Sequence, residues 1–143
     1  MFPGRKGMGT DRAAFDDWLR RYFEAWGSND PQAVASLFAD DAEYHTGPFS
    51  GPRMRGRAQI VERWTADPDA QRDIRWSYDP LAVEDDLGVA HWTVTYSPGA
   101  DPDRRVEMDG ILVIRFDGEG RYVDHREWYA TRETRVDASP GSG

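Results

Sequence analysis

The sequence predicts an α+β domain in which three N-terminal helices pack on a strongly curved, mostly antiparallel mixed β-sheet. Apolar residues recur at helical spacing in the first half of the chain, whereas alternating stretches rich in β-branched and aromatic residues fill the second half. Elements segregated in this way are typical of helices that cover one face of a sheet. With 143 residues, the chain is long enough for one domain with a substantial core.

Capping residues place the elements of the first half. Asp11 can cap the first helix, and we expect Gly27 to end it. Asp30 suits the cap of a short second helix, and Pro31 suits its first position. The expected elements are helices over 11–27, 30–39 and 57–67, a strand over 41–46 and a loop over 47–56.

Long β segments follow the third helix. Pro80 lacks an N–H group, so the first of these strands should lie at an edge of the sheet or carry a bulge. The segment DGEG predicts a hairpin turn between the last two strands. We expect strands over 72–85, 88–97, 104–116 and 121–132.

Composition and charge narrow the class of protein. The chain has no cysteine, so disulfides and thiolate metal sites are excluded. Its net charge of −8 opposes binding to nucleic acid or to an anionic membrane surface. It contains neither an apolar run that would span a membrane nor a signal-peptide pattern, so we expect a cytoplasmic protein. Residues 11–134 should form the single domain, flanked by disordered segments at 1–10 and 135–143.

Four segments carry a resemblance to a known family: RRYFEAWGSND, ASLFADDAEYHT, RGRAQIVERW and GILVIRFDGEGRYVDHREWY. With them the chain resembles the SnoaL-like branch of the nuclear-transport-factor-2-like superfamily. The resemblance implies a cone-shaped roll whose bent sheet wraps a long first helix and leaves a mostly apolar pocket at its open end. The superfamily includes ketosteroid isomerases, polyketide cyclases, epoxide hydrolases and dehydratases as well as binding modules, so it implies the fold more firmly than the function.

Strand periodicity predicts which side chains face this pocket. Phe116 should point inward before the turn, and Val123 should do so after it. Because successive side chains alternate, His125 and Glu127 then face inward on the last strand. A bulge would reverse the alternation downstream of it. The expected pocket residues are Trp18, Trp26, Thr46, Trp64, Trp92, Tyr96, Leu112 and Tyr129.

The pair of His125 and Glu127 is the leading candidate for acid/base chemistry. The resemblance to polyketide cyclases implies an acid/base carboxylate at position 127, with a histidine two residues before it. A carboxylate buried among aromatic rings gains proton affinity, which suits a general base. Tyr22 and Tyr44 are candidates to donate hydrogen bonds to a developing enolate. The alternative is that Glu127 pairs with an arginine or a tryptophan and only holds the scaffold together.

Other mechanisms of the superfamily fit less well. Steroid isomerisation by the family mechanism needs two aspartates, but Thr46 and Leu112 stand at the implied positions, so we exclude that mechanism. Water activation of the epoxide hydrolase kind remains an alternative for Asp109, with Arg105 or Arg115, if a bulge near Gly110 turns Asp109 inward.

The sequence therefore predicts a cofactor-independent enzyme that acts on a small hydrophobic carbonyl or polyketide-like molecule by aldol cyclisation or isomerisation. A non-catalytic small-molecule binding protein is the main alternative. His45 and His91 are expected on the outer face, apart from His125, so we expect no metal site. We also expect a homodimer through the outer sheet face, which would include His91, Thr93, Asp109 and Trp128.

Overall fold

The computed structural model describes residues 11–46, 54–67, 70–99, 101, 103–118 and 120–135. Most of the two terminal segments for which disorder is expected lies outside these ranges. Arg135 belongs to the last strand, so the expected tail is one residue too long at its start.

The first helix, α1, spans Arg12–Ser28 and begins as expected, because a side-chain oxygen of Asp11 accepts a hydrogen bond from the first turn. The expected end at Gly27 is wrong. Asn29 adopts the left-handed conformation with φ 57° and gives its backbone N–H to the carbonyl of Ala25. Asparagine tolerates this region better than most residues, so the helix can pass through Gly27 and end at Ser28, with Asn29 as its cap.

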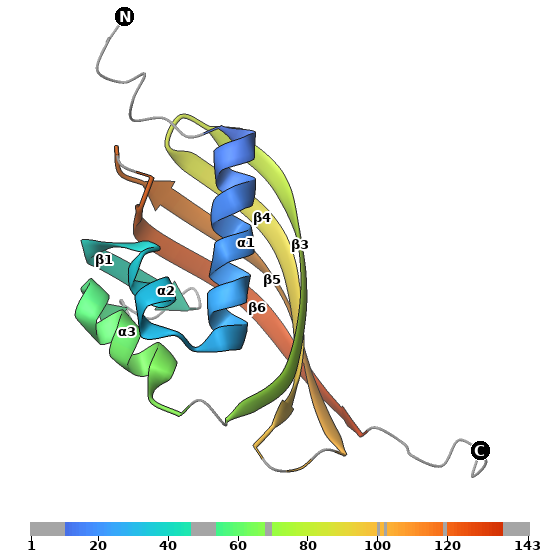
Figure 1. Cartoon of the computed structure of the whole chain (residues 1–143). Coiled ribbons are helices and arrows are strands. Elements are labelled where there is room, and N and C mark those ends of the chain that lie inside the picture. The colour runs from blue at the N-terminus through green and yellow to red at the C-terminus, as the bar shows by residue number, and fades with distance from the viewer. Residues whose placement is uncertain are drawn as a thin grey trace, which may run out of the picture.

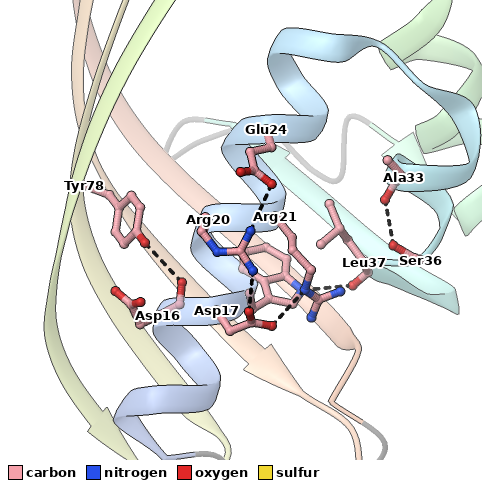
Figure 2. Close-up of polar contacts among 10 residues, drawn as sticks. Asp16, Asp17, Arg20, Arg21, Glu24, Ala33, Ser36, Leu37 and Tyr78 are labelled. Atoms are coloured by element: carbon pink, nitrogen blue, oxygen red, sulfur yellow. Dashed lines mark hydrogen bonds and ion pairs between the residues drawn. The ribbon is translucent and has the colours of Figure 1, made fainter.

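Ion pairs cover the solvent face of α1 (Figure 2). Arg20 reaches Asp17 at 2.6 Å and Glu24 at 3.1 Å, and Arg21 reaches Asp17 at 3.0 Å. These residues are three or four positions apart, so they lie on one side of the helix. The opposite side carries the buried residues Phe15, Trp18, Leu19, Tyr22, Phe23 and Ala25.

The remaining elements follow the expected order. The short α2, Pro31–Ala35, is capped by Asp30 and has proline at its first turn, as expected. The first strand starts earlier than expected, and a two-residue strand interrupts the expected loop. After α2 the elements are β1 (Phe38–Thr46), β2 (Met54–Arg55), α3 (Arg57–Thr65), β3 (Gln71–Glu84), β4 (Leu87–Pro98), β5 (Arg104–Phe116) and β6 (Tyr122–Arg135).

All six described strands form one mixed sheet in the order β2-β1-β6-β5-β4-β3. The strand pairs are antiparallel except for β1 and β6, which run parallel. The sheet is long, twisted and curved; α1 lies against its concave side, with α2 and α3 beside β1 (Figure 1). The expected α+β class with a curved, mostly antiparallel sheet is confirmed, and the sheet is not closed into a barrel.

The expected alternation of side chains is confirmed around the turn, but Tyr129, which was expected in the pocket, is 44% exposed because it lies beyond the part of the strand that the helices cover. Leu112, Ile114 and Phe116 of β5 are buried against the helices, and so are His125 and Glu127 of β6. Because β5 and β6 pair without a register shift until the turn, one face of both strands forms the floor of the core. This places the two candidate acid/base residues inside the molecule.

Pro80 and Gly110 mark different features. Pro80 lies on the edge strand β3, next to a register shift, as expected. Gly110 sits in regular pairing on both sides, so the suspected bulge is absent there. A Cβ on Gly110 would lie 2.5 Å from the carbonyl oxygen of Trp128 and 2.9 Å from the Trp92 ring. Gly110 therefore lets the backbone of β6 and the indole of Trp92 approach closely, and Asp109 stays on the outer face.

Candidate functional site

A chain of buried hydroxyl and carboxyl groups joins three elements of the fold. The Tyr44 hydroxyl on β1 donates to Oε1 of Glu127 on β6 at 2.6 Å, and the hydroxyls of Tyr44 and Tyr22 lie 2.9 Å apart. A phenol has one proton to donate. Because Tyr44 gives its proton to Glu127, Tyr22 must be the donor to Tyr44. The chain therefore runs from Tyr22 on α1 through Tyr44 to Glu127, which is only 3% exposed.

The pKa of Tyr22 agrees with this direction. Burial raises the pKa well above the ordinary value of 10.0, and the nearby negative charge of Glu127 raises it further. The hydrogen bond with Tyr44 acts in the opposite sense but does not reverse the shift. Tyr22 therefore keeps its proton and remains a donor within the chain.

His125 packs against both tyrosines. Its ring is fully buried, stacks on the Tyr44 ring at 4.1 Å between centroids with an interplanar angle of 9°, and lies 5.4 Å from the Tyr22 ring. His125 Nε2 is 3.4 Å from Oε1 of Glu127. No arginine or lysine in the described ranges pairs with Glu127, in contrast to the scaffold alternative. The imidazole thus holds the ring of Tyr44 and contacts the carboxylate that Tyr44 binds.

Tyr44 also faces a cavity of about 290 Å³. This volume is near the lower end of the range for small-molecule sites. The cavity lies between the C-terminal end of α1, the end of α3, β1 and the start of β3, so Tyr44 connects it to the buried carboxylate. Its described lining residues are Trp26, Asn29, Tyr44, Arg63, Trp64, Ala66, Asp67, Ala70 and Gln71.

Several lining residues were not expected from the sequence. Gln71 accepts a hydrogen bond of 2.5 Å from Nε1 of Trp26, and Arg63 and Asp67 come from the end of α3 and the turn after it. No local pattern distinguishes these residues from other polar residues near helix and strand ends. Gln71 lines the cavity because the sheet curves and brings the start of β3 toward the end of α1.

The predicted pocket residues divide into two groups. Trp26, Trp64 and Tyr44 line the cavity. Trp18 instead belongs to the core, where its ring stacks on Tyr22 and its Nε1 donates to the carbonyl of Leu37 at 3.2 Å. The side chain of Thr46 lies outside the described part of the structure. The predicted residues absent from the described cavity lining are Trp18, Trp92, Tyr96, Leu112 and Tyr129.

Leu112 and Glu127 face each other on neighbouring strands. They are register partners in the antiparallel pair of β5 and β6, and both side chains are buried. The resemblance implies an acidic group at position 112 in steroid isomerases, where this chain has leucine. The carboxylate of Glu127 therefore enters the core from the strand next to that position.

The residues of the epoxide hydrolase alternative lie on the outer face of the sheet and bind different partners there. Asp109 has a side chain that is 68% exposed and lies 2.7 Å from Nε2 of His91. Arg105 instead binds Asp73, at 3.1 Å. Asp109 therefore lies on the outer face, as strand parity predicts, and the alternative in which a bulge turns it into the pocket is wrong, because the strand pairing at Gly110 is regular.

The remaining histidine, His45, was expected at the surface, but its side chain is buried. It is buried on the side of β1 opposite to Tyr44, with its Nε2 3.4 Å from Glu43 and 3.7 Å from Asp124. Over the described ranges no three histidine, aspartate or glutamate side chains converge in the way a metal ion would need. In the same part of the chain, none of the helices has the length and apolar character needed to cross a bilayer.

Comparisons with known proteins agree with this fold. The family model of the SnoaL-like domain matches residues 19–125. A steroid Delta-isomerase from Nocardioides simplex is 30% identical over 112 residues, which cover 78% of this chain and 86% of the relative.

Solved structures show the same architecture at lower sequence identity. SalBIII, an epoxide hydrolase/cyclase-like enzyme in pyran ring formation in polyether salinomycin, superposes with a TM-score of 0.68 at 18% identity, over 84% of this chain and 93% of SalBIII. An epoxide hydrolase of the LEH-like type from Mycobacterium tuberculosis gives a TM-score of 0.61 at 17% identity, over 80% of each chain. At these identities the likeness is one of fold.

Proposed function

The chain belongs to the SnoaL-like family, and on that premise we propose that it is an enzyme that enolises a small, flat, mostly apolar carbonyl compound, with aldol cyclisation or isomerisation as the outcome. The observation that carries the proposal is the buried chain from Tyr22 through Tyr44 to Glu127, which meets the cavity at Tyr44. The isomerase relative and the cyclase-like structural neighbour support this class of reaction.

In the proposed reaction Glu127 is the base and Tyr44 carries the proton. Glu127 does not line the cavity, whereas Tyr44 does. A proton leaves the carbon next to the substrate carbonyl and binds the Tyr44 oxygen, as the Tyr44 proton passes to Oε1 of Glu127. The electron pair of the broken C–H bond forms the enolate. The enolate then takes the proton back at another carbon, which is isomerisation. Alternatively it attacks a second carbonyl carbon, whose oxygen becomes an alkoxide and takes the proton back from Tyr44 as Glu127 returns its own to Tyr44, which is aldol closure.

Two residues position Tyr44 for this transfer. Tyr22 donates to its oxygen and so directs its proton toward Glu127, and His125 stacks on its ring. Both are completely buried, which keeps water away from the chain and strengthens its electrostatic interactions. The donor of Tyr44 is occupied by Glu127, so in this arrangement Tyr44 offers an acceptor to the cavity, not the enolate-stabilising donor expected from the sequence.

The cavity walls suit a flat substrate. Trp26 and Trp64 lie 6.2 Å apart between ring centroids with an interplanar angle of 56°. Both line the cavity beside Tyr44, and Trp64 contacts the ring of Tyr44 at 6.4 Å. Aromatic walls of this kind bind apolar rings strongly and exclude water from the reacting carbon.

Exchange of α-protons tests the proposal without knowledge of the natural substrate. The probe is 2-tetralone, a flat bicyclic ketone, incubated with the protein in heavy water and followed by proton NMR. We expect exchange faster than in buffer, with a decrease of about 10²- to 10⁴-fold in Glu127→Gln and Tyr44→Phe. Asp109→Asn makes the same carboxylate-to-amide change on the outer face and should leave the rate unchanged.

The outcomes separate enzyme from binding protein. If wild-type protein quenches its tryptophan fluorescence on binding 2-tetralone but exchanges no protons above the buffer rate, the non-catalytic binding alternative is favoured. Exchange that survives in Glu127→Gln would refute the assignment of Glu127 as the base.

A further inference from the structure

Gln71 lines the same cavity as Tyr44, although their strands lie far apart in the strand order of the sheet. It is the first residue of β3, at one end of the strand order, whereas Tyr44 lies on β1 near the other end. The curvature of the sheet nevertheless brings both residues to the same cavity. Gln71 is half-buried there and lies beside Trp26 of α1.

The bond with Trp26 determines which way the Gln71 amide points. The indole Nε1 is a donor only, so the atom that receives its hydrogen bond at 2.5 Å must be the carbonyl oxygen of Gln71. The NH₂ group therefore lies on the other branch of the amide, away from the indole. No described residue accepts a hydrogen bond from it, which leaves two N–H donors on a residue that lines the cavity.

The cavity thus offers complementary groups. Tyr44 has an oxygen acceptor backed by the charge of Glu127, and Gln71, which lines the same cavity, has a neutral N–H donor that no described residue binds. Enolisation needs this combination, because a proton leaves one atom while negative charge grows on an oxygen two bonds away. A neutral amide binds the uncharged carbonyl only weakly and the developing oxyanion more strongly, so it favours the transition state over the substrate.

We propose that Nε2 of Gln71 donates a hydrogen bond to the substrate carbonyl oxygen, and that this makes Gln71 the residue that selects ketones and stabilises their enolates. The proposal rests on the proposed enolisation and adds a catalytic residue to it. Trp26 is a positioning residue, because it acts by holding the carbonyl oxygen of Gln71. The expected substrate is an uncharged ketone on a flat apolar ring system, with its acidic C–H next to the carbonyl.

Binding of a matched pair of probes tests the proposal apart from turnover. The probes are 2-tetralone and tetralin, which has the same ring system without the carbonyl. Loss of one neutral hydrogen bond should weaken binding of 2-tetralone to Gln71→Met roughly 3- to 10-fold. Binding of tetralin should stay within the error of the measurement. Gln32→Met makes the same change at an exposed position on α2 and should alter neither affinity.

Two further variants separate donor, acceptor and charge. Gln71→Glu still accepts from Trp26 but has no N–H donor, so it should lose the preference for the ketone as Gln71→Met does. Arg63 is the competing charged donor among the described lining residues, and Arg63→Gln should retain the preference. A preference that disappears in Arg63→Gln and survives in both Gln71 variants would overturn the proposal.

The carbonyl stretch of bound 2-tetralone gives a direct readout of the bond. A hydrogen bond from Gln71 should lower its infrared frequency in wild type, and the frequency should rise in Gln71→Met and partly in Trp26→Phe. An equal frequency in wild type and Gln71→Met would overturn the proposal. Because these are binding measurements, a protein that binds the ketone through Gln71 but exchanges no protons would refute enolisation and leave the ketone site standing.

Discussion

Replacement of Tyr44 by phenylalanine removes one oxygen atom and two buried hydrogen bonds. The bond to Glu127 involves a charged acceptor and is worth about 1.5–3 kcal/mol, whereas the neutral bond from Tyr22 is worth about 0.5–1.5 kcal/mol. Both partners are almost completely buried, so water cannot replace the lost bonds. We therefore expect Tyr44→Phe to lower the free energy of unfolding by about 2–4 kcal/mol.

Urea unfolding, followed by tryptophan fluorescence, measures this loss at unchanged slope. Tyr22→Phe removes only the neutral bond and should cost about 1 kcal/mol. Tyr78→Phe is the matched control, because the Tyr78 hydroxyl makes a single bond of 3.3 Å to the carbonyl of Asp16 on the surface of α1 (Figure 2). Its cost should stay below about 0.5 kcal/mol.

A double-mutant cycle isolates the contact between Tyr44 and Glu127. In a Glu127→Gln background the acceptor is neutral, so Tyr44→Phe should cost about 1 kcal/mol less than in wild type. If Tyr44→Phe destabilises the protein no more than Tyr78→Phe does, the reasoning from the buried chain is refuted. A coupling energy of zero would mean that the charge of Glu127 adds nothing to the strength of its bond with Tyr44.

Three other expectations concern pH, packing and assembly. Burial raises the pKa of the Tyr22 hydroxyl above 10.0, so the contribution of Tyr22 to stability is complete below that pH and is lost as the pH rises above it. In thermal melts the Tm should fall at alkaline pH, and the fall should be smaller in Tyr22→Phe. Gly110→Ala places a Cβ 2.7 Å from Cβ of Tyr129 and should lower the free energy of unfolding by about 1–3 kcal/mol in the same urea assay. Gly27 lies in a helix with open space around it, so Gly27→Ala should raise the free energy of unfolding by up to about 1 kcal/mol. We expect a homodimer through the outer sheet face, where Trp128 is 39% exposed; sedimentation should show a dimer that Trp128→Ser weakens, and a monomeric wild type would contradict this.

Local patterns were enough to place the acid/base pair inside the fold. The turn after Phe116 and the strict alternation of a strand imply that His125 and Glu127 face inward, because each side chain's direction depends only on its neighbours along the chain. The cap at Asp11 and the edge position of Pro80 follow from equally local chemistry. The bulge considered at Gly110 failed for the opposite reason, since that glycine is explained by the close approach of two other strands, through the backbone of β6 and the indole of Trp92.

The sequence by itself determined the α+β class, the order of the elements and the inward direction of His125 and Glu127, because helix caps, turns and side-chain periodicity act over a few residues. Only the tertiary structure decided that Trp18 fills the core while Trp26 lines the cavity, and that Tyr44 stands between the cavity and Glu127. It also brought Gln71 to the same cavity from the far end of the strand order. These relations depend on how far the sheet curves around α1, which is set by the packing of the whole domain and by no single stretch of chain.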